Sequence, residues 1–212
     1  MGGSGKPGRD CPRCPRLAAF RNDWRKREPT WFNAPVPSFG PLDARLLIVG
    51  LAPGLRGANR TGRPFTGDYA GDLLYATLAE FGFSRGRYDE RADDGLTLVD
   101  CRITNAVRCV PPENKPTPAE IKTCRDFLAP TLAEMPKLKI LLALGRVAHE
   151  TTVTTLGGKR SASPFSHGCV HAIGSYQMYS SYHCSRYNTN TGVLTEKMFR
   201  AVFADIRAAL GG

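Results

Sequence analysis

Short runs of consecutive apolar residues alternate along this chain with segments in which apolar residues recur every three or four positions. The run over residues 46–49 is continuous and ends at Gly50, which is typical of a parallel strand buried on both faces. Comparable runs predict three more strands, over residues 98–105, 139–144 and 176–182. The chain is therefore expected to form a four-stranded sheet.

Helical spacing predicts helices over residues 15–26, 71–81 and 194–210, and two more that begin near residues 118 and 146. The start at residue 118 is clearly marked, because Thr117 can cap it, Pro118 suits the first turn and Glu120 can complete a capping box. The Gly-rich segment 54–68 and the Pro-rich segment 110–118 are expected to be loops.

Strands that alternate with helices predict an α/β fold, with three αβα layers around a central, mostly parallel four-stranded sheet. Ligand sites of such folds lie in the loops that follow the carboxyl ends of the strands. We expect a single domain over residues 11–212 and a disordered tail over residues 1–10.

Composition indicates a class of partner without changing the predicted fold. The 212 residues are 42% hydrophobic and carry a formal net charge of +10. This charge favours polyanions such as nucleic acid, although a merely basic soluble protein would look the same. No apolar run reaches the roughly 18 residues of a membrane span, and no signal peptide is seen. We expect a cytoplasmic protein, associated with the nucleoid in a prokaryote.

The seven cysteines of such a protein are better explained as metal ligands or buried thiols than as disulfides. Cys11 and Cys14 form a CxxC pair, and Cys109 and Cys124 stand apart as two singles. Zinc and a [4Fe–4S] cluster can each bind four thiolates, and buried free thiols remain an alternative for the two singles. The other three are expected to be core or loop thiols (Cys101, Cys169 and Cys184).

The glycine-rich segment 50–68 matches neither a phosphate-binding P-loop nor a dinucleotide fingerprint. Its glycines allow close approach of backbone to a ligand, and its arginines, Arg56, Arg60 and Arg63, could contact phosphates. Phe65 is either a stacking platform for a base or a loop anchor in the core. Asp68, just before a helix, could be a plain helix cap.

A second candidate segment covers residues 181–188. His183 lies at the end of a predicted strand and is followed by small polar and basic residues. This suits a site at the carboxyl edge of the sheet, although a structural histidine bonded to backbone is the simpler alternative.

Four blocks together resemble the iron–sulfur uracil-DNA glycosylases, and most closely the broad-specificity branch called family 5 or type B. The blocks are residues 11–14, 50–68, 104–124 and 181–192, and the resemblance covers nearly all of the chain after residue 10. It implies a uracil-DNA glycosylase-like fold. It also implies that a [4Fe–4S] cluster is bound by Cys11, Cys14, Cys109 and Cys124.

The resemblance also implies roles in the pocket. The base would lie against Phe65 and a wall made by Gly50, Leu51, Ala52, Pro53 and Gly54. This branch has Gly-Leu-Ala-Pro where other glycosylases place a water-activating carboxylate, and no Asp or Glu occurs within residues 50–57. The carboxylate role therefore moves to Asp68, supported by Asn114 and His183. The neighbouring branch reads uracil with an Asn at the position of Asn105, so Asn105 and Asn114 compete for that role.

The DNA contacts implied by the resemblance come from basic and polar residues of two loops (Arg56, Arg60, Arg63, Ser185, Arg186 and Tyr187). Cys184 stands where many glycosylases have proline or a small apolar residue, which leaves the shape of this second loop open.

The predicted function is a monofunctional DNA glycosylase, acting as a monomer, that hydrolyses the N-glycosidic bond of uracil, hypoxanthine and xanthine and so initiates base excision repair. Asp68 would either activate water or stabilise the sugar cation, and His183 would donate a hydrogen bond to the departing base. The motifs contain no evident Schiff-base lysine, so no strand cleavage is expected. Two rivals remain: a non-catalytic iron–sulfur module for nucleic-acid binding or redox sensing, and a zinc-containing hydrolase of free nucleotides.

Overall fold

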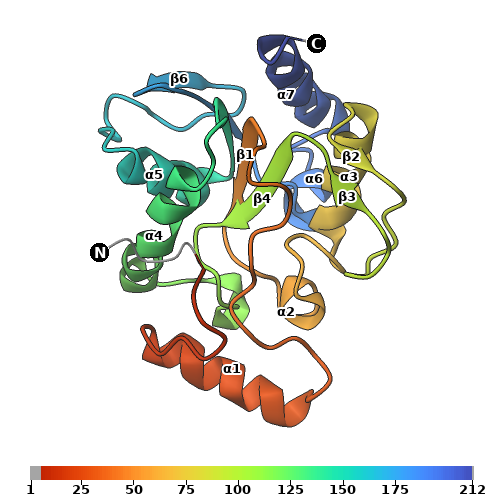
Figure 1. Cartoon of the computed structure of the whole chain (residues 1–212), viewed down its shortest axis with the longest axis vertical. Helices are drawn as coiled ribbons and strands as arrows, with labels where there is room; N and C mark the ends of the chain where they lie inside the picture. The colour runs from red at the N-terminus through yellow and green to blue at the C-terminus, as the bar shows by residue number, and fades with distance from the viewer. Residues whose placement is uncertain (1–5, 212) are drawn as a thin grey trace.

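The computed structural model describes residues 6–211 and has a central five-stranded sheet of order β4-β1-β5-β7-β6 (Figure 1). Four of its strands run parallel: β1 (Leu46–Gly50), β4 (Cys101–Asn105), β5 (Ile140–Leu144) and β7 (Tyr176–Ser181). The mostly parallel α/β sheet is thereby confirmed.

The fifth strand was missed by the sequence prediction. β6 (Val170–Ile173) pairs antiparallel with β7 at the edge of the sheet. It is short, its Val170 is exposed, and its sequence lacks a clear apolar run, so the neighbouring strand rather than local pattern defines it. The predicted strand 98–105 also divides: β3 (Thr97–Leu98) pairs with β2 (Ser84–Arg85) in a separate ribbon, and β4 begins after Asp100, whose φ is 54°.

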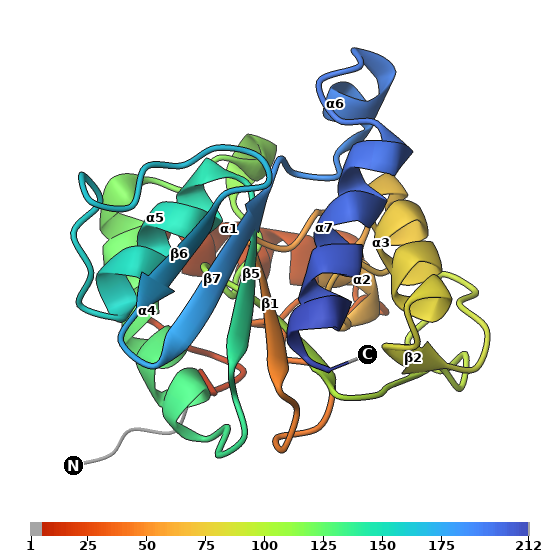
Figure 2. The same ribbon diagram turned by 90° about the horizontal axis from the view of Figure 1, so that it is seen from above.

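Helices cover both faces of the sheet, because side chains of β1 alternate between two cores. Leu46 and Ile48 face the core that includes α3 (Tyr69–Glu80) and α7 (Glu196–Ala209). Leu47 and Val49 face the opposite core, which α4 (Pro118–Ala133) and α5 (Arg146–Thr155) cover. Figure 2 shows the two helix layers on either side of the strands, which confirms the three-layer arrangement.

Helix α4 (Pro118–Ala133) begins at the predicted capping box. Thr117 Oγ1 accepts from the Glu120 amide at 3.3 Å, and Glu120 Oε2 accepts from the Thr117 amide at 2.8 Å. The expected helices α1 (Pro15–Arg27) and α5 (Arg146–Thr155) are also present.

Short helical turns occur within segments that were expected to be irregular. They are α2 (Ala58–Thr61), the 3-10 turn η1 (Pro112–Asn114) and α6 (Arg186–Asn190). Each follows the carboxyl end of a strand, respectively β1, β4 and β7. They therefore shape the edge at which the sequence predicts a site.

Part of the expected disordered tail is held against α1. Residues 1–5 lie outside the described residues, but the Arg9 carbonyl and the Asp10 carboxylate both accept hydrogen bonds from Arg25. The described helices include none that is long and apolar enough to cross a bilayer.

Candidate active site

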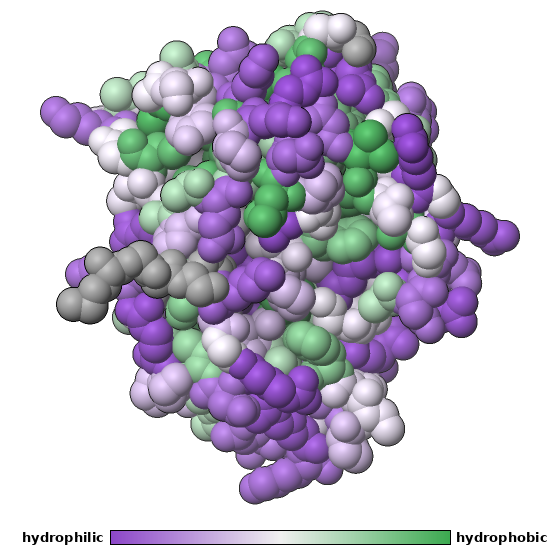
Figure 3. All heavy atoms as spheres, viewed as in Figure 1, coloured by the Kyte–Doolittle hydropathy of each residue, from purple (hydrophilic) through white to green (hydrophobic). Residues whose placement is uncertain are grey.

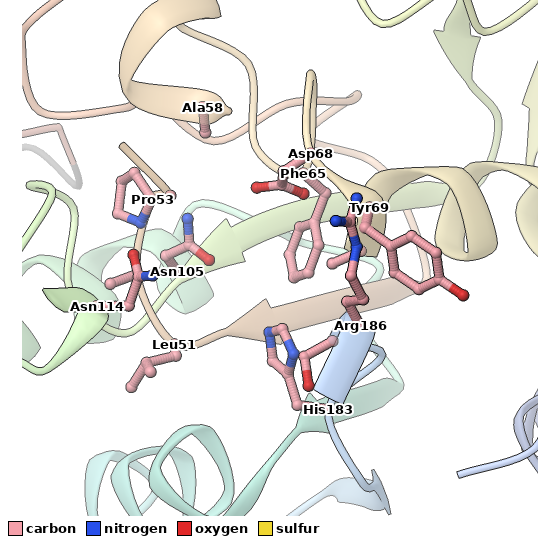
Figure 4. Close-up of a pocket in the computed structure, with 14 residues that line it drawn as sticks. Leu51, Pro53, Ala58, Phe65, Asp68, Tyr69, Asn105, Asn114, His183 and Arg186 are labelled. Atoms are coloured by element: carbon pink, nitrogen blue, oxygen red, sulfur yellow. The ribbon is translucent and has the colours of Figure 1, made fainter. Parts of the chain in front are cut away.

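A cavity of about 400 Å³ opens at the carboxyl edge of the sheet, where the loops after β1, β4 and β7 meet the start of α3. Figure 4 shows the side chains around it, with Asp68, Phe65, Asn105 and His183 surrounding a common space. Most of the predicted base-binding and catalytic residues line this cavity (Leu51, Ala52, Pro53, Gly54, Phe65, Asp68, Asn105, Asn114 and His183).

The floor of the cavity depends on close packing at the end of β1. A Cβ atom at Gly50 would lie 2.6 Å from Phe65 Cζ and would overlap Asn105 Oδ1. Gly50 is therefore not a lining residue itself, but it leaves room for the two side chains that are. Phe65 has a left-handed backbone (φ 54°) and only 7% exposure, so it is both a core anchor and a wall of the pocket.

Asn105 carries an unsatisfied polar atom into this space. It is the last residue of β4 and is only 3% exposed, and its Oδ1 is buried without a hydrogen-bond partner among the described residues. Buried acceptors are nearly always bonded, so this oxygen is available to a ligand that brings a donor. Asn114 differs: it is exposed on η1, with a left-handed backbone (φ 57°) that asparagine tolerates.

The two carboxylate oxygens of Asp68 have different surroundings. As the N-cap of α3, Asp68 accepts from the Gly71 amide through Oδ1 at 3.3 Å. Oδ2 faces the glycine loop, where a Cβ at Gly54 would lie 2.8 Å away and one at Gly57 would clash. Burial is the largest influence and raises the pKa of Asp68, against the lowering by backbone hydrogen bonds. The helix cap and the pocket carboxylate are thus the same residue.

His183 lies opposite, just after β7. Its ring is stacked on Phe65 with centroids 5.9 Å apart. Burial lowers the pKa of His183 to about 4, so the imidazole is neutral at pH 7 and can donate one hydrogen bond.

The loop that carries His183 is tied at two points. The side-chain Nδ2 of Asn188 donates to the His183 carbonyl at 2.8 Å. The buried Cys184 thiol donates to the Ala70 carbonyl at 3.4 Å, in the first turn of the helix that Asp68 caps. A proline or alkyl side chain at position 184 could not make this bond, so the thiol connects the histidine loop to the carboxylate helix.

Arg63 does not lie where we expected it. It is 4% exposed and makes two 2.7 Å bonds to the Asp94 carboxylate, so it is not available to DNA phosphates. Its Nε donates to Thr66 Oγ1, within the loop that holds Phe65. The expected phosphate contact is therefore corrected to a structural role, because the buried partner Asp94 draws the guanidinium inward.

Two tyrosines that sequence analysis did not single out hold the same loop. Tyr75 Oη donates to the Pro64 carbonyl at 2.7 Å. Tyr88 Oη donates to the Phe65 carbonyl at 3.3 Å and accepts from the Gly67 amide at 3.2 Å. Nothing in the local sequence marks these contacts, since they span up to 23 positions. Tyr69, Ala58 and Ala70 were also missed as lining residues, and of these only Tyr69, adjacent to Asp68, could have been suspected.

Of the other predicted DNA contacts, Ser185 and Arg186 line the cavity, and Arg56 and Arg60 lie on the glycine-rich segment that contributes Gly54 and Ala58 to its lining. Arg56 and Arg60 are exposed, and Arg60 Nε donates to the Arg56 carbonyl at 2.8 Å. Arg186 lies 5.2 Å from the Tyr69 ring, and Tyr187 is 74% exposed on α6. Ser185 Oγ accepts from the Asn188 amide as the N-cap of α6, which leaves its hydroxyl proton free to donate.

The four predicted ligand cysteines line one small cavity, bounded also by Leu17, Val107 and Phe127. The Arg108 amide donates to Cys124 Sγ at 3.3 Å. Within residues 6–211, no three Cys, His, Asp or Glu side chains are close enough to hold a single metal ion. An all-thiol donor set suits either a zinc ion or an iron–sulfur cluster.

Comparisons with known proteins agree with this geometry. Residues 37–207 match the family model described as the Uracil DNA glycosylase superfamily. The chain is similar to the Type-5 uracil-DNA glycosylase of Thermus thermophilus, with 44% identity over 95% of this chain and 94% of the relative. It is also similar to the Type-5 enzyme of Pyrobaculum aerophilum, with 38% identity over 95% and 90%. A Type-4 uracil-DNA glycosylase of Archaeoglobus fulgidus is 35% identical over only 58% of this chain and 60% of its own length.

Proposed function

Because this chain belongs to the uracil DNA glycosylase superfamily, we propose that it hydrolyses the N-glycosidic bond of uracil in DNA, as the names of its relatives suggest. The observation that carries the proposal is the buried, unbonded Oδ1 of Asn105 beside the Phe65 ring. Uracil presents an N3–H donor next to its O4 acceptor. A carboxamide can bond both, while Phe65 stacks on the ring face.

Between the two asparagines, Asn105 is the better base reader. It is the last residue of β4 and is buried, whereas Asn114 is exposed on a short turn. A rigid, desolvated amide discriminates better because a mismatched ligand leaves it unpaired. Asn114 then serves at the rim of the pocket, next to the sugar or the attacking water.

The chemistry is divided between Asp68 and His183. The glycosidic bond breaks with positive charge on the sugar and negative charge on the base. The Asp68 carboxylate stabilises the sugar cation or orients water, and the neutral His183 donates a hydrogen bond to the base anion. One donor aimed at developing charge in this way is worth about 3–4 kcal/mol. None of the pocket residues is a lysine, so we propose base release without strand cleavage.

We propose the same activity on hypoxanthine and xanthine. The cavity of about 400 Å³ is roomy for a pyrimidine and can admit a purine. Both purines also carry a donor next to a carbonyl, the pattern that the Asn105 amide can bond. Flipping is least costly for mismatched bases, which favours deaminated sites over normal pairs.

We further propose that Cys11, Cys14, Cys109 and Cys124 bind a [4Fe–4S] cluster. When bound, such a cluster would supply iron–thiolate links and have a structural role. Cys11 and Cys14 precede α1, and Cys109 and Cys124 lie before and after η1 along the chain. A cluster bound by all four would therefore connect these two segments. Loading of the four-cysteine cavity thus restrains the turn that presents Asn114 at the pocket.

The proposed setting is DNA in the cytoplasm, associated with the nucleoid in a prokaryote, with the enzyme acting as a monomer. The exposed Arg56, Arg60 and Arg186, with the net charge of +10, would attract the phosphates.

The proposal is tested on oligonucleotides that contain a single uracil, hypoxanthine or xanthine. We expect alkali-labile abasic sites in these and none in the matched thymine, adenine and guanine strands. Iron and sulfide analysis of the same protein tests the cofactor. Intact oligonucleotides would support a non-catalytic module. Stoichiometric zinc with turnover of free deoxyuridine nucleotides, but not of DNA, would support a nucleotide hydrolase.

A further inference from the structure

A buried arginine beside the four-cysteine cavity, Arg21, forms no salt bridge with any of the described residues. Arg21 of α1 is 3% exposed. Its Nη1 lies 3.7 Å from Cys109 Sγ, and its Nη2 donates to the Cys11 carbonyl at 3.2 Å. Its Nε is buried without a hydrogen-bond partner among the described residues. The guanidinium therefore faces two of the four predicted ligand residues.

Two exposed arginines near this cavity have acidic partners. Arg13 pairs with Asp126 and Arg16 pairs with Glu120. Asp10, directly before Cys11, is mostly exposed, is paired with Arg25 and has only a weaker electrostatic interaction with Arg21. An unpaired buried cation is strongly destabilising, so the position of Arg21 calls for negative charge that protonated thiols do not supply.

We propose that Arg21 is the counter-charge of the thiolate-bound cluster, and that it favours cluster retention by compensating negative charge and by donating to Cys109 Sγ. This inference rests on the proposed cofactor. Four thiolates outweigh the positive charge of the iron–sulfur core, so the loaded cavity carries excess negative charge. Arg21 is thus a positioning residue for the cofactor and touches neither the base nor the reacting atoms.

A second cation borders the same cavity. Arg108 is 1% exposed, and its guanidinium donates to the hydroxyls of Ser38 and Thr131. Arg108 thus contacts the four-cysteine cavity through its backbone amide, while two hydroxyls accept the hydrogen bonds of its guanidinium. Arg21 is the one whose guanidinium points directly at a ligand sulfur.

The test compares loaded wild-type protein with Arg21→Met, Arg21→Gln and Arg21→Lys. Cluster loss to a chelator is followed by the decay of visible absorbance. We expect Met and Gln to lose the cluster about 10- to 100-fold faster, the usual effect of removing a contact to a metal ligand, and Lys to restore most of the retention. Arg27→Met is the matched control, since Arg27 is exposed on the same helix and lies over Trp24, and it should behave as wild type.

A thermal melt separates charge compensation from simple packing. Arg21→Met should lower the midpoint of the cluster-loaded form and raise that of the cluster-free form, because only the latter contains an uncompensated cation. A packing role would lower both midpoints. If Arg21→Met does not fold, the rates of cluster loss from Arg21→Gln and Arg21→Lys are compared instead.

Equal cluster-loss rates in wild type and the Met and Gln variants, or equally fast loss from Gln and Lys, would overturn this inference while leaving the cofactor proposal intact. Wild-type protein without iron and sulfide would instead overturn the cofactor itself and this inference with it.

Discussion

At the scale of single residues, the pocket contains two titratable side chains, Asp68 and His183, whose buried environments disfavour their charged forms. Burial raises the pKa of Asp68 and lowers the pKa of His183 to about 4. The Oδ1 of Asn105 is an acceptor that has no hydrogen-bond partner among the described residues. These are features of a site that is arranged for a ligand at some expense of stability.

Asp68→Asn should separate activity from stability. Asparagine still caps α3, but the carboxylate charge is lost, so we expect excision to fall about 100-fold or more. The folded pKa of Asp68 is raised, so its contribution to stability is present at low pH and is lost as the pH rises through that pKa. The variant should therefore melt higher than wild type at neutral pH. A lower melting temperature at pH 7 would contradict this account.

The pH profile of excision should have one acid limb, set by Asp68. Its pKa is raised by burial, so activity should fall at a pH above that of an ordinary aspartate, as protonation removes the charge. His183, with a pKa of about 4, should add no limb near neutrality. Single-turnover rates between pH 4 and 9 measure this. Residual activity of Asp68→Asn should lack the limb, and a limb that persists there would point to another group.

Asn105→Ala should weaken recognition of the base. Loss of hydrogen bonds to a desolvated ligand costs about 1–3 kcal/mol, so kcat/KM on uracil DNA should fall roughly 10- to 100-fold. Asn114→Ala serves as the comparison, and its effect should be mainly on kcat because it lies at the rim. If Asn114→Ala instead carried the larger loss in substrate discrimination, the assignment of the base reader would be reversed.

At the scale of elements, the loop between β1 and α3 owes its shape to side chains from distant segments. Arg63 is bound to Asp94, and Tyr75 and Tyr88 bond the carbonyls on either side of position 65. These contacts hold Phe65 in its left-handed backbone conformation and orient the residues that lead to Asp68. The loop that positions Phe65 and Asp68 in the pocket is therefore stabilised by side chains from distant segments of the chain.

Asp94→Asn should destabilise the whole domain. It leaves the buried Arg63 without its counter-charge, which costs about 3–5 kcal/mol. The Arg63 guanidinium holds the pKa of Asp94 well below its usual range, so this stability is present above the unfolded pKa and is lost as the pH falls. Urea unfolding at pH 7 measures the change. Asp93→Asn is the control, because Asp93 is 84% exposed and should be neutral.

At the scale of the whole molecule, a charged surface surrounds an apolar pocket. Figure 3 shows hydrophilic residues over much of one face, most densely at the lower end where α1 lies. α1 carries three basic residues in its last turn and no acidic residue in its first. Under the proposed function, we expect the excess positive charge to hold DNA by its backbone while the base is read at the sheet edge.

Binding to DNA should weaken steeply with salt, in the same way for uracil-containing and normal duplexes. Arg56→Ala and Arg60→Ala should each reduce the slope of log affinity against log salt by about one. Arg63→Met should leave the slope unchanged in the folded protein, because Arg63 is paired with Asp94. Fluorescence anisotropy at several salt concentrations decides, and a reduced slope for Arg63→Met would place that arginine back among the phosphate contacts.

Much of this protein is determined by local sequence. Continuous apolar runs specify the central strands, since residues buried on both faces need no polar positions, and Thr117 with Glu120 specifies the start of α4. Because the carboxyl ends of parallel strands lie at the same edge of a sheet, the sequence also predicts that Asn105 and His183 share that edge.

Other features were decided only by the tertiary structure, because they depend on partners far away in the chain. Arg63 turns inward because Asp94 is buried beside it, and β6 is a strand because β7 offers its edge. Asp68 is both cap and pocket carboxylate because Gly54 and Gly57 pass close to its second oxygen. The local sequence pattern shows whether a residue suits its own helix or strand, whereas burial and charge pairing depend on the packed fold.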